Sequence, residues 1–86
     1  MIKIFTKEGC PYCVLAKNLI SSLWFEYEEI DITNDNDKFR ELASVSEMIT
    51  VPQIFAWEIS SENLLWGYDN INKLNEEGKL IDILSK

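Results

Sequence analysis

The chain has no histidine, and its 86 residues include only two cysteines, two prolines and three glycines. A structural zinc site needs four ligands drawn mainly from cysteine and histidine, so this composition excludes a closed zinc site of that kind. No run of apolar residues approaches the length of a membrane span, and the N-terminal residues lack the pattern of a signal peptide. We therefore expect a protein without a membrane partner.

Basic residues are also scarce, with eight against fifteen acidic ones, and the net charge is −7. Such a charge disfavours nucleic acid and anionic membranes as partners. The charge is unevenly placed, because residues 1–25 carry three lysines and one glutamate, whereas residues 26–86 carry five basic and fourteen acidic side chains. The positive N-terminal section suits an anionic ligand, although an ordinary solvated surface explains the same distribution equally well.

The length and the ordinary globular composition fit one domain spanning residues 1–86. Apolar alternation predicts strands at 1–6, 25–32, 50–57 and 64–66, and helical periodicity predicts three helices between and after them. The order β-α-β-α-β-β-α predicts an α/β domain in which helices cover both faces of a four-stranded mixed sheet. The alternation within 25–32 changes phase, which indicates either a bulge or a strand covered on both faces.

A dithiol motif lies where the first strand becomes a helix, within Lys7-Glu8-Gly9-Cys10-Pro11-Tyr12-Cys13. Pro11 suits the first helical position, which places Cys10 at the N-cap. Its sulfur then faces unpaired N–H groups and the positive end of the helix dipole, both of which favour a thiolate. We therefore expect Cys10 to be the reactive sulfur, with Cys13 one turn further along.

The spacing of Cys10 and Cys13 allows a tight disulfide, and hence a two-electron redox couple. Half of a zinc site is the first alternative, but the chain lacks the further ligands. A static disulfide is the second, but a loop this small restrains the unfolded chain little. The strand-to-helix context favours redox chemistry. Because free-thiol chemistry belongs to a reducing compartment, we expect a cytoplasmic protein.

Three segments carry a resemblance to a known family: Lys7 through Cys13, Thr50-Val51-Pro52-Gln53, and Gly67-Tyr68-Asp69. With them the chain resembles a small glutaredoxin of the Cys-Pro-Tyr-Cys type over nearly its whole length. The resemblance implies a thioredoxin-like fold and an enzyme, a glutathione-dependent thiol–disulfide oxidoreductase that reduces protein disulfides and glutathione mixed disulfides. It implies glutathione as the reductant, with no metal, and we expect a monomer.

The resemblance implies a catalytic pair, Cys10 and Cys13, and a glutathione site formed by Lys7, Tyr12, Thr50, Val51, Pro52, Tyr68, Asp69 and Asn70. It also implies a cis bond before Pro52, where the residues alone would favour a trans proline opening a strand. Lys7 is expected to stabilise the thiolate and attract a carboxylate, and an exposed, solvated lysine is the alternative. Asp69 or Asn70 is expected to cap the last helix, a role compatible with binding a ligand amine.

Two departures from the family bear on the glutathione pocket. Trp66 stands where the family has the first of two glycines. Glu47-Met48-Ile49 stands where many relatives carry a basic residue, for which Lys38 or Arg40 could substitute. Their effect on glutathione affinity stays open.

Disulfide-containing or glutathionylated proteins are the expected partners, and ribonucleotide reductase is one substrate that the resemblance suggests. A binding module is a rival function, in which a dimer holds an iron–sulfur cluster through Cys10 and glutathione. A closer rival is a thioredoxin-like reductant recharged by a flavoprotein reductase, although the usual Trp-Cys-Gly-Pro-Cys is absent.

The helices are expected to bury particular residues. Leu15, Leu19, Ile20 and Leu23 mark the apolar face of the first helix, and Ile71, Leu74, Ile81 and Leu84 mark that of the last, which Gly78 interrupts. Thr33 or Asn34 is expected to cap the second helix, which should end near Ser44. Trp57 is expected near a turn and exposed, and Trp66 is expected to pack.

Overall fold

The computed structural model describes residues 2–85, so Met1 of the first expected strand lies outside the described residues. Its elements follow the predicted order, with the last helix in two pieces. They are β1 (Ile2–Thr6), α1 (Pro11–Ser22), β2 (Tyr27–Asp31), α2 (Asn36–Ser46), β3 (Gln53–Phe55), β4 (Leu64–Trp66), α3 (Tyr68–Glu76) and α4 (Leu80–Leu84). A 3₁₀ turn over Ser61–Asn63 leads into β4.

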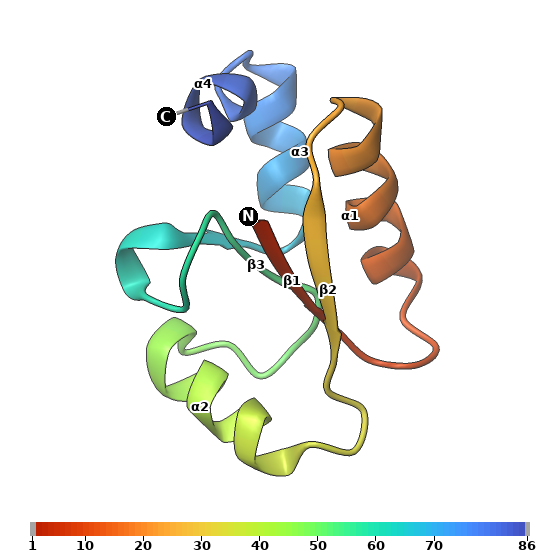
Figure 1. Cartoon of the computed structure of the whole chain (residues 1–86), viewed down its shortest axis with the longest axis vertical. Coiled ribbons are helices and arrows are strands. Elements are labelled where there is room, and N and C mark those ends of the chain that lie inside the picture. The colour runs from red at the N-terminus through yellow and green to blue at the C-terminus, as the bar shows by residue number, and fades with distance from the viewer. Residues whose placement is uncertain (1, 86) are drawn as a thin grey trace.

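The strands form one mixed sheet in the order β2-β1-β3-β4, as predicted. β1 pairs in parallel with β2 and antiparallel with β3, and β4 returns antiparallel to β3. The parallel pair is joined by the crossover helix α1, which Figure 1 shows alongside β2.

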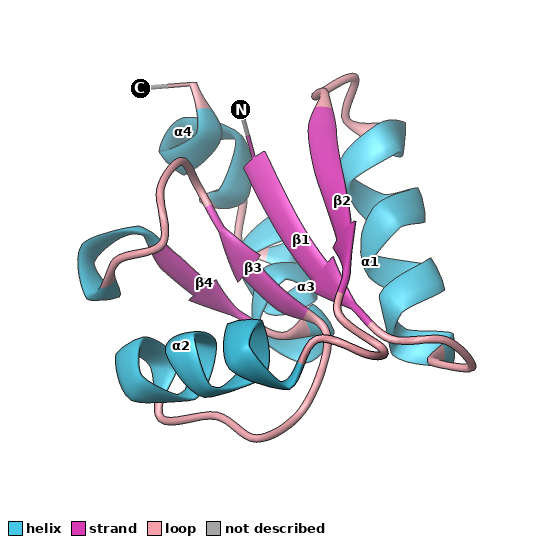
Figure 2. Ribbon diagram, turned by 60° about the horizontal axis from the view of Figure 1, so that its bottom comes forward, coloured by secondary structure: helices cyan, strands magenta, loops and turns pink. Residues whose placement is uncertain are grey.

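Helices cover both faces of the sheet. In Figure 2, α2 lies in front of the strands, and α1 and α3 lie behind them. Each face has its own apolar core. The larger core, against α1, α3 and α4, is built from Ile2, Ile4, Ala16, Ile20, Ile54, Ala56, Leu65, Ile71, Leu80 and Leu84. The smaller core, against α2, is built from Phe5, Ile32, Leu42 and Phe55.

The phase change along 25–32 reflects a segment that packs on both faces. Phe25 and Tyr27 pack against the larger core, whereas Ile30 and Ile32 belong to the smaller one. The register of β2 with β1 is continuous from Tyr27 to Asp31, so the strand contains no bulge. Of the two explanations, coverage on both faces is therefore confirmed.

Two residues expected in the core are exposed. Leu15 is 43% exposed, and Cys13 and Ala16 are buried beside Ile20 instead. Ile81 is 48% exposed, because Gly78, with φ of +72°, ends the preceding helix and α4 starts with a new rotation that buries Leu80. The break at Gly78 itself is confirmed.

The helix starts also differ from expectation. Asp35 caps α2, accepting from the Lys38 N–H at 3.0 Å, and the helix runs on to Ser46. Gly67 is the N-cap of α3, so Asp69 and Asn70 lie inside its first turn. Asn70 Oδ1 accepts from the Gly67 N–H at 3.4 Å, which satisfies the backbone from within the helix.

The third strand is shorter than the expected 50–57. It begins at Gln53, because Pro52 has no N–H to give to a strand ladder. Trp57 is exposed as expected, whereas Trp66 is 48% exposed and the packing expected for it is wrong. Within residues 2–85 there is no helix with both the length and the apolar character needed to cross a membrane.

Candidate redox site

Cys10 and Cys13 form a disulfide at the start of α1. Cys10 is the N-cap residue with extended backbone, Pro11 occupies the first turn, and the Cys13 N–H donates to Cys10 Sγ at 3.1 Å. Cys10 is partly exposed and Cys13 is 2% exposed. The geometry therefore leaves one sulfur accessible from solvent and keeps the other beneath it, as an attacking and a resolving thiol require.

The loop before β3 brings a second segment to the disulfide. Cys10 Sγ lies 3.8 Å from the Val51 carbonyl oxygen, and the Val51–Pro52 bond is cis, as the resemblance implied. The buried amide of Gln53 holds this loop by donating to the Met48 and Thr50 carbonyls at 3.2 and 3.0 Å. Ser46 Oγ donates to Gln53 Oε1 at 2.8 Å, which ties the loop to α2.

A groove of about 360 Å³ runs between this loop and the start of α3. Seven of the eight residues expected to bind glutathione line it, together with Met48 and Gly67. The seven are Tyr12, Thr50, Val51, Pro52, Tyr68, Asp69 and Asn70. The rings of Tyr12 and Tyr68 lie 6.2 Å apart, so residues from α1, the loop and α3 meet here although they are far apart in sequence.

Lys7, the eighth residue, lies elsewhere. Its Nζ sits 4.1 Å from the centre of the Phe39 ring on α2, a cation–π contact. It lines a different cavity, of about 460 Å³, which both cysteines also line. The structure thus places Lys7 near the disulfide but outside the groove.

The two departures from the family can now be located. Trp66 has φ of +67°, a left-handed backbone conformation that glycine adopts without steric cost. Its side chain lines a separate cavity together with Leu65 and Leu74. Lys38 and Arg40 pair with carboxylates of their own helix, at 2.8 Å and 3.6 Å, and neither lines the groove. In this structure neither residue substitutes for the missing basic residue.

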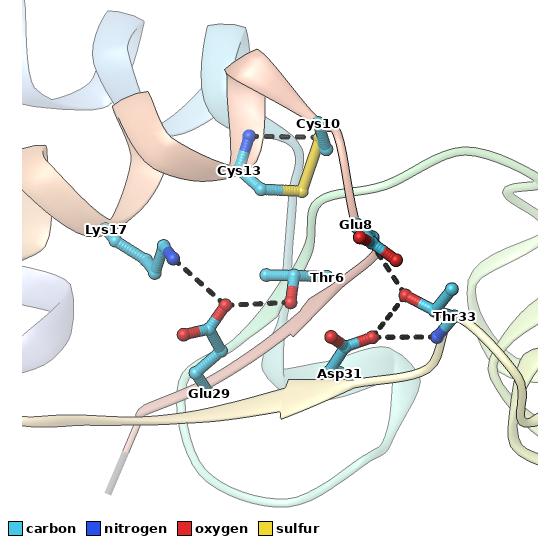
Figure 3. Close-up of polar contacts among 8 residues, drawn as sticks. All are labelled: Thr6, Glu8, Cys10, Cys13, Lys17, Glu29, Asp31 and Thr33. Atoms are coloured by element: carbon cyan, nitrogen blue, oxygen red, sulfur yellow. Dashed lines mark hydrogen bonds and ion pairs between the residues drawn. A yellow bond between two sulfur atoms is a disulfide. The ribbon is translucent and has the colours of Figure 1, made fainter.

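A polar cluster lies on the other side of the disulfide (Figure 3). Glu29 Oε2 accepts from Lys17 Nζ at 3.0 Å and from Thr6 Oγ1 at 2.9 Å. The hydrogen bond from Lys17 holds the pKa of the Glu29 carboxyl below its usual range, and the Thr6 hydroxyl acts in the same direction. The cavity that Lys7 lines also contains all three side chains, so this cluster and Cys13 share one space.

A neighbouring carboxylate orders the loop that leads to the motif. Asp31 accepts from the Thr33 hydroxyl and, at 2.8 Å, from the Thr33 N–H, and these bonds lower the pKa of Asp31. Thr33 Oγ1 in turn accepts from the Glu8 N–H at 2.8 Å. The end of β2 thereby holds the backbone immediately before Gly9 and Cys10.

The structural roles of three residues near the disulfide, Gln53, Thr6 and Glu29, do not follow from the sequence pattern alone. Gln53 belongs to a motif of the resemblance and to the expected strand, but its buried amide also holds the loop before β3, and a polar residue among buried apolar ones is the signal of such a role. Thr6 and Glu29 meet only through the pairing of β1 with β2, which no local pattern reveals. No group of three or more potential metal ligands gathers within residues 2–85.

Comparison with known proteins gives a consistent picture. The family model described as Glutaredoxin matches residues 2–58. Glutaredoxin 3 of Escherichia coli (strain K12) is 37% identical over 83 residues, covering 96% of this chain and 95% of the relative. Glutaredoxin 1 of Rickettsia bellii (strain RML369-C) is 35% identical over 88 residues, covering 96% of this chain and 85% of the relative.

Solved structures agree with the topology. The buckwheat glutaredoxin–glutathione complex superposes with a TM-score of 0.83 at 25% identity, covering 98% of this chain and 76% of that one. The solution structure of glutaredoxin from Brucella melitensis superposes with a TM-score of 0.81 at 35% identity, covering 96% and 86%. The predicted thioredoxin-like fold is therefore confirmed.

Proposed function

This chain belongs to the glutaredoxin family and is a glutathione-dependent thiol–disulfide oxidoreductase, and on that premise we propose how its own residues divide the work. Cys10 is the attacking thiolate and Cys13 the resolving thiol. The observation that carries this assignment is their unequal burial, since Cys10 is partly exposed at the helix N-cap whereas Cys13 is 2% exposed. Only the exposed sulfur is open to an incoming disulfide.

The reaction begins when the Cys10 thiolate attacks one sulfur of a substrate disulfide. A bond forms between Cys10 and that sulfur, and the other sulfur leaves as a thiolate that takes up a proton. With a glutathione mixed disulfide, glutathione stays on Cys10, and a second glutathione thiolate releases it as glutathione disulfide. With a protein disulfide, Cys13 attacks Cys10, the protein leaves as a dithiol, and Cys10–Cys13 is left oxidised.

The groove beside Cys10 is the proposed glutathione site. Val51 precedes the β3 ladder and lies next to Cys10, so its backbone is placed to pair with the cysteinyl unit of glutathione. The γ-glutamyl carboxylate would meet the start of α3, where free N–H groups favour an anion. Asp69, in the first turn of that helix, would accept from the γ-glutamyl ammonium.

Lys7 has a longer-range role in this proposal. Lys7 lines the cavity that both cysteines line, so its positive charge favours the thiolate at Cys10 and draws anionic substrates toward it. We propose glutathionylated and disulfide-containing proteins as substrates, in the cytoplasm, for a monomer that works without a metal.

A turnover assay tests the proposal. A glutathione mixed disulfide is supplied as substrate, and recharging by glutathione is compared with recharging by a thioredoxin reductase. We expect turnover with glutathione, retained in Cys13→Ser and abolished in Cys10→Ser. Reduction of a protein disulfide should be lost in both variants. Recharging by the reductase alone, or activity in Cys10→Ser, would contradict the assignment.

A further inference from the structure

The cavity on the Cys13 side of the disulfide contains charges that the proposed mechanism does not use. It is lined by both cysteines and by an ion pair, Lys17 with Glu29, which joins α1 to β2 at 3.0 Å. Figure 3 shows the Lys17 ammonium and the Thr6 hydroxyl both directed at the Glu29 carboxylate. We propose that Lys17 and Glu29 are positioning residues for the second chemical step, the attack of Cys13 on the mixed disulfide at Cys10.

That step requires a proton to leave a sulfur that is almost fully buried. Cys13 is 2% exposed, and burial in apolar surroundings favours the neutral thiol. The Cys13 thiol must lose its proton to solvent before its sulfur forms the bond to Cys10. The bond between Cys10 and the substrate sulfur then breaks, and the substrate leaves as a thiolate. A nearby positive charge favours the deprotonated state, and a nearby negative charge opposes it.

Several charged groups face this cavity, and most are held in other contacts. Lys7 lies over Phe39, and the Asp31 carboxylate is held by Thr33. Glu8 is exposed on the loop before the motif. On the opposite side of the disulfide, Val51 and Pro52 bring no charge, and Asp69 lines the separate groove.

Lys17 is the cation that α1 itself contributes, four residues after Cys13 and so one helical turn away. Its side chain is 24% exposed, and its ammonium donates to Glu29 Oε2, which also accepts from the Thr6 hydroxyl. Glu29 is ionised at neutral pH, and the contact with Lys17 lowers its pKa further, so the cavity that Cys13 lines contains both signs of charge. Removing one member should therefore shift the pH at which Cys13 reacts, in a direction set by the charge that remains.

The sheet offers a matched control. Lys3 and Glu28 form an ion pair of the same length, 3.0 Å, which joins β1 to β2 through the residue next to Glu29. Successive side chains of a strand face opposite sides of the sheet, so Glu28 points away from the face that carries Glu29 and α1. Glu28→Gln thus removes a comparable pair without altering the cavity.

The test separates the two steps in a single reaction and rests on the proposed roles of the cysteines. Fully reduced protein is mixed with one equivalent of the chromogenic disulfide dithiobis-nitrobenzoate. Attack by Cys10 releases a first coloured thiolate, and attack by Cys13 on the resulting mixed disulfide releases a second. The rate of the second release is followed against pH in the wild type, Lys17→Met, Glu29→Gln, the double variant and Glu28→Gln.

We expect Lys17→Met to raise the pH midpoint of the second release and to slow it about threefold at neutral pH, the scale of a partly exposed charge pair. Glu29→Gln should lower the midpoint, because the lysine charge remains. The double variant should return close to the wild type, and Glu28→Gln should not shift. A structural role would instead slow the step in both single variants without opposite shifts.

Two failures can be told apart. Absence of the first release, or its persistence in Cys10→Ser, overturns the proposed roles of the cysteines. This inference alone is overturned if the first release is normal but the pH midpoint of the second release does not move in Lys17→Met. It is also overturned if that midpoint stays unchanged or rises in Glu29→Gln. A Cys13→Ser protein, which should give only the first release, identifies the second signal.

Discussion

At the scale of single residues, two adjacent glutamates of β2 differ in what they do because they face opposite sides of the sheet. Glu28 pairs with Lys3, and Glu29 pairs with Lys17 beside the disulfide. Only Glu29 has a second donor, Thr6, and only its carboxyl shares a cavity with Cys13. Because side chains alternate along a strand, Glu28 forms an ion pair on one face of the sheet, whereas Glu29 forms an ion pair beside the disulfide on the other face.

Glu29 also ties stability to acidity. Its folded-state pKa is lowered from the ordinary 4.5, chiefly by the hydrogen bond from Lys17, so its contribution is present above pH 4.5 and is lost as the pH falls through the folded-state value. Glu29→Gln should lower the free energy of unfolding at neutral pH by less than about 1 kcal/mol, since the pair is partly exposed. At acidic pH the free energies of unfolding of the variant and the wild type should converge. Denaturant titrations at neutral and acidic pH measure both.

Lys17→Met is the control for that effect, because it removes the donor that lowers the pKa of Glu29. It should likewise weaken the loss of stability on acidification. If Glu29→Gln and the wild type differ in unfolding free energy by the same amount at every pH, the stability that the pair contributes does not depend on proton binding.

Asp69 lies in the first turn of α3 rather than at its N-cap, and this changes the expected effect of its substitution. As an N-cap it would have been replaceable by asparagine, but it lies within the first turn of α3, where its charge interacts with the helix dipole. Asp69→Asn and Asp69→Ala should therefore cost similar stability, about 0.5 kcal/mol, and both should weaken glutathione use. Thermal unfolding and glutathione-dependent turnover check this. Full activity in a stable Asp69→Asn protein would move the glutathione site elsewhere.

At the scale of elements, one break at Gly78 separates the C-terminal helices α3 and α4. Gly78 has φ of +72°, and the residues after it start α4 with a new rotation that buries Leu80 and Leu84. A continuous helix would have kept one apolar face through both pieces. The break is what lets α3 present its start to the groove while α4 closes the larger core.

Gly78→Ala should destabilise the protein by about 1 kcal/mol, because an L side chain is disfavoured at this φ. The added methyl group would meet nothing within 4 Å, so the cost is purely that of the backbone. Gly67→Ala is the comparison, since Gly67 has φ of −104° and its added carbon would lie 3.6 Å from the Pro52 oxygen, an ordinary contact. Because Gly67 is also the N-cap of α3, where alanine caps poorly, its variant has a capping cost of its own. An unchanged unfolding free energy in Gly78→Ala would contradict the role of Gly78.

At the scale of the whole molecule, the sheet separates two cores of unequal size. The larger one joins α1, α3 and α4, and therefore holds both helix starts that form the site. The smaller one anchors α2 through Leu42, packed against Phe5, Phe55 and Ile32. The rings of Phe5 and Phe55 meet edge to face, 5.8 Å apart, within this smaller core.

Leu42→Ala should lower the free energy of unfolding by about 2–5 kcal/mol, because the Leu42 side chain is fully buried. Leu15→Ala makes the same chemical change at a residue that is 43% exposed, and should stay within about 0.5 kcal/mol of the wild type. Denaturant unfolding measures both. The folded fraction of Leu42→Ala should keep its turnover, since Leu42 lines neither cavity beside the disulfide. Loss of activity in folded protein would show that α2 supports the chemistry directly.

The sequence by itself determined the features that depend on neighbouring residues. Pro11 after Cys10 specifies the N-cap, alternation specifies the sheet, and Gly78 specifies the break, because each acts within one turn or one strand. The motifs carried by resemblance also led to seven residues that converge on one groove. These conclusions needed only local conformational preferences and a recognisable order of motifs.

Tertiary structure alone decided which side chains meet across elements. The helix face that is buried, with Ala16 rather than Leu15 inside, follows from how α1 docks on the sheet. The N-cap of α3 is Gly67 rather than Asp69 or Asn70, because the position where the chain turns into a helix depends on the preceding strand. Lys17 and Glu29 meet beside Cys13 only because β1 and β2 pair in parallel under α1, and contacts between residues so far apart in sequence are set by packing rather than by local pattern.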